Sequence, residues 1–446
     1  MAIQSRDADV IVIGGGIAGL GAALRLKDRG LDPLVLEAES RVGGRMTTDR
    51  VDGFVIDRGV TLLGNAFGSM RALVRRLGLS PLVCKGSSFS VGIQDAAGRR
   101  GYRGGRFDDL LLDRGISLRA RLASIRFGLD LLRHNRALVH GCSTLSGSLD
   151  GEDARTYFRR IGGEEVFERI LRPGLNGPVG GSVETSSRVI LMQVLWNLLV
   201  RGQWNLTNGV DRIPEAVASE VKVVTEARAL QVEQVDSGVH VEVAVRGRQQ
   251  SLRARAAILA IPGQLVPTVC PRLPEDTRGL LSRTQYSRIV NAAVALSRPP
   301  QVPYAGYAFT EDVVPGAEIE MEHLRAPNRC PKGTGMAGVF LWDTPQLHRL
   351  DANDESLKQQ ACDVVEQNFP ECRGKVLFVH LIRWDIGIAQ FPPGRLREMT
   401  ALRKQLAAWT APFDLCGDYL DGLSSEGALR TGEEAADRIA QKIKTH

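Results

Sequence analysis

The sequence predicts an α/β fold with at least two domains, and three observations lead to that prediction. Residues 10–13 form an apolar run of valine and isoleucine, which is typical of a strand buried on both faces of a parallel sheet. A glycine-rich turn, a helical segment at 20–26 and a second apolar run at 34–36 follow directly. The chain has 446 residues, which is more than one hydrophobic core normally supports, so a second domain is expected.

The glycines of the first turn have the G-x-G-x-x-G spacing of a dinucleotide-binding unit. The first allows a tight turn, the second the close approach of a pyrophosphate, and the third the packing of helix against strand. These glycines are Gly14, Gly16 and Gly19. Ile17 and Ala18 belong to the helix N-terminus, on which the phosphates would lie. Glu37 ends the second apolar run and would accept hydrogen bonds from a ribose diol.

The composition is that of a soluble globular protein. The chain is 43% hydrophobic and 24% charged, with a formal net charge of +6. A nucleic-acid partner is not supported, because neither a basic run nor a zinc-binding spacing accompanies this charge. A basic surface also suits an anionic membrane or a carboxylated substrate.

Cysteine usage and the distribution of apolar residues favour a cytoplasmic location. The seven cysteines are dispersed and contain no C-x-x-C pair, which indicates reduced thiols and neither a disulfide framework nor a metal site. The sequence shows no secretory signal and no apolar run of transmembrane length. We therefore expect a cytoplasmic protein without a metal, and peripheral contact with a membrane stays open.

The segment after Glu37 resembles a family signature. Arg41, Gly43, Gly44 and Arg45 complete an E-x-x-x-R-x-G-G-R pattern, which would gather backbone N–H groups and a guanidinium near the same phosphates. The pattern resembles the signature of the flavin amine oxidase superfamily, which includes amine oxidases, L-amino-acid oxidases, protoporphyrinogen oxidases and carotenoid desaturases. The resemblance implies non-covalent FAD and a Rossmann-type FAD-binding domain of the amine-oxidase kind, joined to a discontinuous α+β substrate domain.

Other segments resemble further nucleotide-side motifs of the same superfamily. Residues 53–59 are similar to its G-x-x-x-D-x-G strand, whose end runs beside the flavin ring, and residues 257–262 to its V-I-x-A-x-P strand end. Residues 413–418 resemble its C-terminal hydrophobic-G-D, and residues 425–432 its x-E-G-A-x-x-S-G, where a helix N-terminus points at the flavin. The resemblance implies cofactor contacts at Ala38, Gly59, Val60, Thr61, Ala229, Ala260, Gly417, Asp418, Ser425, Glu426 and Ala428.

These motifs divide the chain into predicted domains. The FAD-binding domain is expected in three pieces, 1–86, 205–285 and 385–446. The substrate domain is expected to combine a helical part, 87–204, with a β-rich part, 286–384.

The helical part contains two apolar segments. Large apolar residues recur at helical spacing on one face of the first, and arginines lie mostly off that stripe. The stripe consists of Leu118, Leu122, Ile125, Leu129 and Leu132. The second segment, 187–200, is apolar nearly all round. We expect both to be buried in the core of the substrate domain, with a membrane-docking face or the wall of a substrate cavity as the alternative.

The expected surroundings of the flavin favour one branch of the superfamily. Monoamine-type oxidases place two aromatic residues opposite the ring and a lysine near its N5 atom. Alignment puts Gly387 and Ser424 at the aromatic positions, and residues 288–293 contain no lysine. Residues 384–394 instead resemble the A-I-P-Q-Y-x-x-G segment of protoporphyrinogen oxidases.

We therefore expect an FAD-dependent oxidase or dehydrogenase of the protoporphyrinogen oxidase-like kind. It would take a hydride from a bulky, largely apolar small molecule onto flavin N5, by C–C or C–N dehydrogenation, and pass electrons to O2 or another acceptor. No catalytic side chain is assigned. The alternatives are an amine or amino-acid oxidase of a biosynthetic pathway that forms an imine, and a redox-neutral FAD-dependent isomerase or cyclase.

Overall fold

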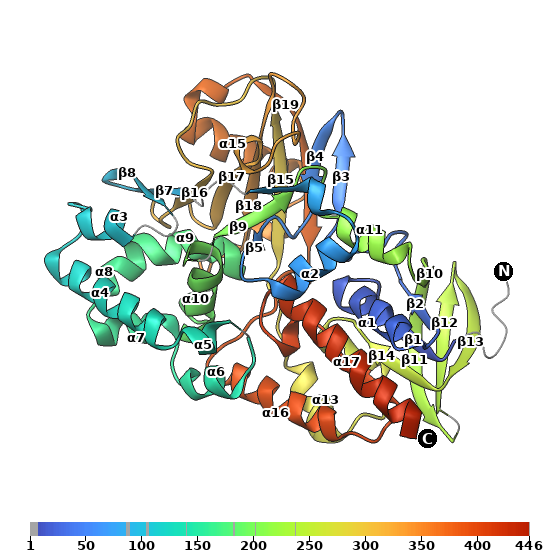
Figure 1. The fold of residues 1–446 in the computed structure, drawn as a ribbon. Coiled ribbons are helices and arrows are strands. Elements are labelled where there is room, and N and C mark those ends of the chain that lie inside the picture. The colour runs from blue at the N-terminus through green and yellow to red at the C-terminus, as the bar shows by residue number, and fades with distance from the viewer. Residues whose placement is uncertain are drawn as a thin grey trace.

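The structure is a computed structural model, and Figure 1 shows its fold. It describes residues 8–85, 90–103, 107–139, 141–181, 183–200, 202–236 and 238–445.

A five-stranded parallel sheet forms the core that contains the first apolar run, and it confirms the predicted α/β class. The strand order is β10-β2-β1-β14-β20, with every neighbouring pair parallel. The bounds are β1 Val10–Ile13, β2 Pro33–Leu36, β10 Lys222–Val224, β14 Ala256–Leu259 and β20 Phe413–Leu415. β1, β2 and β14 are buried throughout, as continuous apolar runs require in a sheet covered on both faces.

Two long helices pack side by side against this sheet (Figure 1). They are α1, Ile17–Asp28, and α17, Ser425–Thr445. A side chain at Gly21 would collide with Leu429, and one at Gly432 with the backbone of Ala18. Small residues therefore allow the two helices to approach closely.

Smaller elements surround the parallel sheet. An antiparallel sheet is inserted in the chain between β10 and β14, with β11 Ala227–Val235, β12 Gly238–Val245 and β13 Arg248–Ala254. Two further sheets contain β3 Thr48–Val51 with β4 Phe54–Asp57, and β5 Leu63–Gly64 with β9 Gln203–Leu206 and β6 Val83–Lys85. The helices are α2 Gly68–Arg76, α11 Arg212–Ala218, α12 Val266–Val269, α13 Glu275–Ser282 and α16 Arg395–Ala408.

A seven-stranded sheet has the order β19-β15-β18-β17-β16-β7-β8. The bounds are β7 Ser90–Asp95, β8 Gly98–Arg103, β15 Ile289–Leu296, β16 Gly306–Phe309, β17 Ala317–Met321, β18 Gly335–Leu341 and β19 Val376–Trp384. β7 pairs in parallel with β16, so two strands from the segment expected to be helical extend the β-rich part. α14 Glu322–Arg325 and α15 Asp354–Asn368 accompany this sheet. The expected boundary at residues 86 and 87 lies outside the described residues, and the division into domains remains a prediction.

Residues 107–200 supply a group of helices on one side of the molecule (Figure 1). The helices are α3 Phe107–Leu112, α4 Leu118–Arg133, α5 Asn135–Leu138, α6 Thr144–Leu149, α7 Ala154–Ile161, α8 Glu164–Val166, α9 Arg172–Val179 and α10 Arg188–Val194. π-helical segments run over Phe167–Leu171 and Leu195–Val200. No helix in the described part of the chain is long and apolar enough to cross a membrane.

The apolar stripe of α4 corrects one expectation. α10 is buried as predicted, but Leu118, Leu122, Ile125, Leu129 and Leu132 all lie on the exposed surface. The helix instead buries its other face. The physical reason is that the aromatic cluster beneath α4 accepts Phe127 together with small residues, which leaves the larger aliphatic side chains outside.

Candidate active site

The glycine-rich turn between β1 and α1 is closed on one side and open on the other. Gly14 has φ 106°, and a Cβ there would lie 2.5 Å from the carbonyl oxygen of Ala260. A Cβ at Gly19 would collide with the carbonyl oxygen of Gly14. At Gly16 a Cβ would meet nothing within 4 Å. The turn therefore packs tightly against β14 and leaves an open approach to the backbone at Gly16, where α1 begins, with Ile17 and Ala18 in its first turn.

Glu37 stands at the edge of this opening. Its Oε2 accepts a hydrogen bond of 2.6 Å from the backbone N–H of Gly15, and its Oε1 one of 2.8 Å from Glu39. Burial raises the pKa of Glu37, while these N–H donors act in the opposite direction. The carboxylate is thus held in a fixed position beside the turn, next to Ala38 and the start of β11, where Ala227 donates to the Glu37 carbonyl.

The second pair of glycines lies against the first turn. Gly43 donates a backbone hydrogen bond of 2.8 Å to the carbonyl of Gly15, and a Cβ at Gly44 would come within 3.5 Å of the Cα of Gly16. The side chain of Arg41 points elsewhere, because its Nη1 donates to Asp49 at 2.6 Å. The structure therefore brings Gly43 and Gly44 to the turn and leaves the Arg41 guanidinium with another partner.

Arg45 joins segments from both ends of the chain. Its Nη1 lies 2.7 Å from Oδ2 of Asp418 and donates to the carbonyl of Gly387 at 2.6 Å. The guanidinium also stacks on the ring of Tyr286, 5.7 Å from the centroid. Burial acts to lower the pKa of Arg45, but the Asp418 carboxylate outweighs it and the pKa is raised.

The segment after β4 runs along Arg45. Val60 donates a backbone hydrogen bond of 3.0 Å to the Arg45 carbonyl, and Gly59 packs against the same carbonyl. The carbonyl of Thr61 accepts a hydrogen bond from Asn205. Gly59 and Val60 thus lie next to the backbone of Arg45, and their predicted contact with the cofactor remains a prediction.

The C-terminal segment contributes the backbone at Gly417 and the N-terminus of α17. The backbone N–H of Gly417 donates to Thr431 Oγ1 at 3.0 Å, which ties β20 to α17. Ser425 and Ala428 lie in the first turn of α17. Glu426 has a different position from that expected of a ligand-facing side chain, since its two carboxylate oxygens accept the backbone N–H groups of Ser69 and Met70, both at 2.8 Å. It caps the N-terminus of α2.

Two predicted positions lie on the sheets. Ala260 follows β14 and donates its backbone N–H to the carbonyl of Ile13 at 2.7 Å. Ala229 lies in β11, where the pairing with β12 is irregular. Ala260 therefore packs against the glycine-rich turn. Ala229 lies two residues beyond Ala227 in β11.

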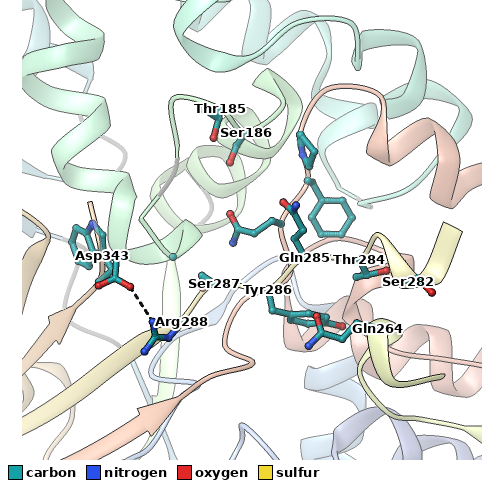
Figure 2. A pocket seen from close by; sticks show the side chains of 15 residues that line it. Thr185, Ser186, Gln264, Ser282, Thr284, Gln285, Tyr286, Ser287, Arg288 and Asp343 are labelled. Carbon is teal, nitrogen blue, oxygen red and sulfur yellow. Dashed lines mark ion pairs between the residues drawn. The ribbon is translucent and has the colours of Figure 1, made fainter. Parts of the chain in front are cut away.

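A pocket of about 580 Å³ opens beside Tyr286 (Figure 2), the residue on whose ring the Arg45 guanidinium stacks. Tyr286 and Ser287 belong to its wall, and they adjoin Arg45 and Gly387. Much of the wall carries uncharged polar side chains from separate loops. The lining residues are Gly180, Thr185, Ser186, Gln264, Ser282, Thr284, Gln285, Tyr286, Ser287, Arg288, Trp342, Asp343, Gln390, Phe391 and Pro392.

The charged groups of this pocket pair with each other. Arg288 Nη1 lies 3.5 Å from Asp343 (Figure 2) and 2.8 Å from Asp351. The remaining polar side chains of the wall are hydroxyls and amides. Sequence motifs did not single out Thr185, Gln264 or Trp342, because each belongs to a short segment that carries no local pattern.

The positions that carry aromatic residues in monoamine-type oxidases have other roles in this chain. A Cβ at Gly387 would lie 2.9 Å from the backbone oxygen of Ser287, so the site has no room for a ring. Ser424 Oγ accepts the backbone N–H of Gly427 at 3.0 Å, at the start of α17. In β15, Asn291 donates to the carbonyl of Asp57, and its amide oxygen is buried without a hydrogen-bond partner among the described residues.

The pocket wall contains a tyrosine, Tyr286. Burial raises the pKa of the Tyr286 phenol, whose oxygen accepts the backbone N–H of Gly263 at 3.1 Å. This hydroxyl is therefore a neutral, polar part of the pocket wall. None of the residues that line the pocket is a histidine, and no cluster of metal-ligand type occurs in the described parts of the chain.

The chain is similar in sequence and in fold to known oxidases. Residues 17–440 match the family model described as flavin containing amine oxidoreductase. The chain is 21% identical to coproporphyrinogen III oxidase of Bacillus subtilis, over 94% of each protein. It is 29% identical to mitochondrial protoporphyrinogen oxidase of Nicotiana tabacum, over 42% of this chain and 36% of that one. Its fold is similar to that of cyclohexylamine oxidase from Brevibacterium oxydans, with TM-score 0.76 and 20% identity over 98% of this chain and 100% of that one.

Proposed function

The chain belongs to the family of flavin-containing amine oxidoreductases, and we propose that within it the protein dehydrogenates a bulky substrate in the manner of the porphyrinogen oxidases. It is an FAD-dependent oxidoreductase. The finer assignment concerns the bond that is oxidised: a C–C or C–N bond of a substrate with a large, mainly apolar frame.

The pocket carries this proposal. Its volume of about 580 Å³ lies within the range of roughly 300–1,000 Å³ that holds molecules of drug size. Its two charged residues, Arg288 and Asp343, neutralise each other, so the wall offers positioning groups and no free acid or base. Such a site suits a reaction in which the bound flavin accepts the hydride and the protein orients the C–H bond.

The lining adds a property that the sequence did not suggest. Hydroxyl and amide side chains such as those of Ser186 and Gln390 line the pocket together with Trp342 and Phe391. This combination favours an apolar frame with polar substituents over a plain hydrocarbon. The porphyrinogens named for the Bacillus and tobacco relatives are candidate substrates of this description.

We also propose how the chain holds FAD. The opening at Gly16 and the adjoining Gly43–Gly44 would receive the pyrophosphate, and Glu37 the ribose. Gly59, Val60 and Thr61 would lie along the flavin, and the Arg45–Asp418 pair between the two halves of the cofactor. The residues fit the group, because the backbone at Gly16 is open and the Glu37 carboxylate is fixed on the N–H of the adjacent Gly15.

Reduction of the bound flavin by a substrate panel tests the proposal. Under anaerobic conditions the absorbance near 450 nm should fall with a porphyrinogen, and not with a polyene precursor, a primary amine or an amino acid, and readmitted oxygen should restore it. Gln390→Leu should slow the reduction at unchanged flavin content, and Gln359→Leu, at an exposed site on α15, should leave it unchanged. Reduction of the flavin by the amine alone would indicate the amine oxidase alternative. Turnover of a substrate without reduction of the flavin would indicate the isomerase alternative.

A further inference from the structure

The exposed face of α4 carries an apolar stripe of unusual continuity. Its five large side chains, Leu118, Leu122, Ile125, Leu129 and Leu132, are between 46% and 71% exposed. They recur every three or four residues, so they form one row along the helix. Exposed apolar residues are ordinarily scattered, and a continuous row marks a surface that another body covers.

The opposite face of α4 fixes the direction of this row. Phe127 packs on Phe158 with ring centroids 4.9 Å apart, and on Tyr157 at 6.2 Å. Ala120, Ala123 and Leu131 are buried on the same face. Ser117 caps the helix by accepting the N–H of Ala120. The helix is therefore anchored through its small and aromatic residues and cannot turn the leucines inward without losing that packing.

Arginines run beside the stripe. Arg119, Arg126 and Arg133 follow each other at intervals of seven residues, which places them on one side of the same helix. All three are exposed. Among the described residues none of the three forms an ion pair, and Arg126 donates only to the carbonyl of Ile161. The row therefore presents unneutralised positive charge at the border of an apolar surface.

Neighbouring elements extend the surface. Leu112 at the end of α3 is 73% exposed and Leu145 on α6 is 56% exposed. α3 contacts α4, and α6 contacts α5, which follows α4 in the chain. Figure 1 places α3 and α4 at the margin of the molecule, on the side away from α1 and α17, so a planar surface can reach them.

We propose that this face of α4 is a docking surface for an anionic lipid bilayer. The leucines would enter the boundary between headgroups and acyl chains, and the three arginines would meet the lipid phosphates. A second copy of the chain is a poorer occupant, because a symmetric contact would place the same positively charged face on both sides of the interface. The inference goes beyond the proposed function and does not depend on the substrate.

Sedimentation with lipid vesicles tests the proposal on the full-length holoenzyme. Vesicles of phosphatidylcholine with about one third phosphatidylglycerol should bind the protein, and vesicles of phosphatidylcholine alone should bind it markedly less. Added salt should weaken binding, because it screens the arginines.

Paired variants separate the apolar and the charged contributions. L122Q/L129Q should lower the affinity for anionic vesicles about tenfold or more, since each leucine would lose contact with the acyl region. L377Q is the matched control, because Leu377 is 53% exposed on β19. R119Q/R133Q should lower the affinity about fivefold per arginine, whereas R228Q/R246Q, which removes two exposed arginines elsewhere, should not.

Three results would overturn the proposal. The first is the absence of binding to anionic vesicles at low salt. The second is an equal loss of binding in L377Q and in L122Q/L129Q. The third is a concentration-dependent dimer that L122Q/L129Q abolishes without any binding to vesicles, which would assign the face to a second copy of the chain.

Discussion

The guanidinium of Arg45 lies 2.7 Å from the carboxylate of Asp418, so segments 373 residues apart in the chain meet at one point. The same guanidinium bonds to the carbonyl of Gly387 and covers the ring of Tyr286. One ion pair thereby links the glycine-rich segment after β2, the end of β20 and the wall of the pocket.

Removal of two carboxylates should abolish retention of the cofactor. In the Glu37→Ala/Asp418→Ala variant the turn loses the acceptor for Gly15 and Arg45 loses its counter-ion. Each charged hydrogen bond to the cofactor contributes roughly 1.5–3 kcal/mol, so FAD affinity should fall at least about a hundredfold. The purified variant should be colourless at 450 nm. Glu39→Ala, which changes an exposed neighbouring carboxylate, should stay yellow, and a fully yellow double variant would contradict the assignment.

A methyl group at Gly387 should destabilise the protein. The new Cβ would lie 2.9 Å from the Ser287 oxygen and 3.0 Å from Ile289, and the backbone must shift to relieve this contact. Gly387→Ala should lower the free energy of unfolding by about 1–3 kcal/mol. Gly68→Ala is the matched control, since a Cβ there meets nothing within 4 Å. Equal urea midpoints for the two variants would show that the contact at Gly387 is relaxed at no cost.

Asp49 should make the stability depend on pH in acid. Burial acts to raise its pKa, but hydrogen bonds from Arg41, His380 and Arg58 outweigh this and lower the pKa to about 2. The unfolded chain should have an aspartate pKa of about 3.9, so the ionised group stabilises the fold above that pH. This contribution, about 1–2 kcal/mol, should disappear as the pH falls from about 4 to 2.

Urea titrations of Asp49→Asn and of Asp312→Asn check this expectation. The first variant should lose stability at pH 7 and show a flatter acid profile. The second changes an exposed aspartate and should behave like the parent protein. An unchanged acid profile in Asp49→Asn would place the titrating group elsewhere.

The buried ion pair of Arg329 and Asp57 should be sensitive to the loss of one partner. Arg329 Nη1 lies 2.6 Å from Asp57 Oδ2, and both side chains are fully buried. Arg329 also donates to Asn205 and Leu206. Arg329→Met leaves the Asp57 carboxylate buried without a cation, so the free energy of unfolding should fall by about 3–5 kcal/mol. Arg246→Met, at an exposed ion pair, should cost less than about 1 kcal/mol, and similar losses in both would contradict the structural role of the pair.

Much of the nucleotide-side architecture could be predicted because its signals are local. The apolar runs of β1 and β2, the glycine spacing between them and the acid at the end of β2 all lie within 28 consecutive residues. Hydrophobic periodicity and turn chemistry act over such short distances. The same holds for Gly417 and the first turn of α17, which lie in one C-terminal segment.

The buried face of α4 and the residues of the pocket wall could not be predicted in this way. Two faces of α4 carry apolar residues, and only the aromatic rings of α7, which the sequence does not place next to it, decide that the Phe127 face is buried. The pocket likewise combines Thr185, Gln264 and Trp342 from three segments that are far apart in the sequence. Glu426 shows the limit of a motif. The sequence pattern identified the residue, but in the folded chain its carboxylate accepts hydrogen bonds from the N-terminus of α2.

The order of strands in the parallel sheet has a consequence for biogenesis. β1 and β2 are synthesised first, yet their neighbours β10 and β14 follow only after residue 221, and β20 after residue 412. α17, which packs against α1, is made last of these elements. During synthesis β1 and β2 therefore have no partner strands at their outer edges until later segments emerge. Unpaired strand edges favour binding by chaperones over early folding.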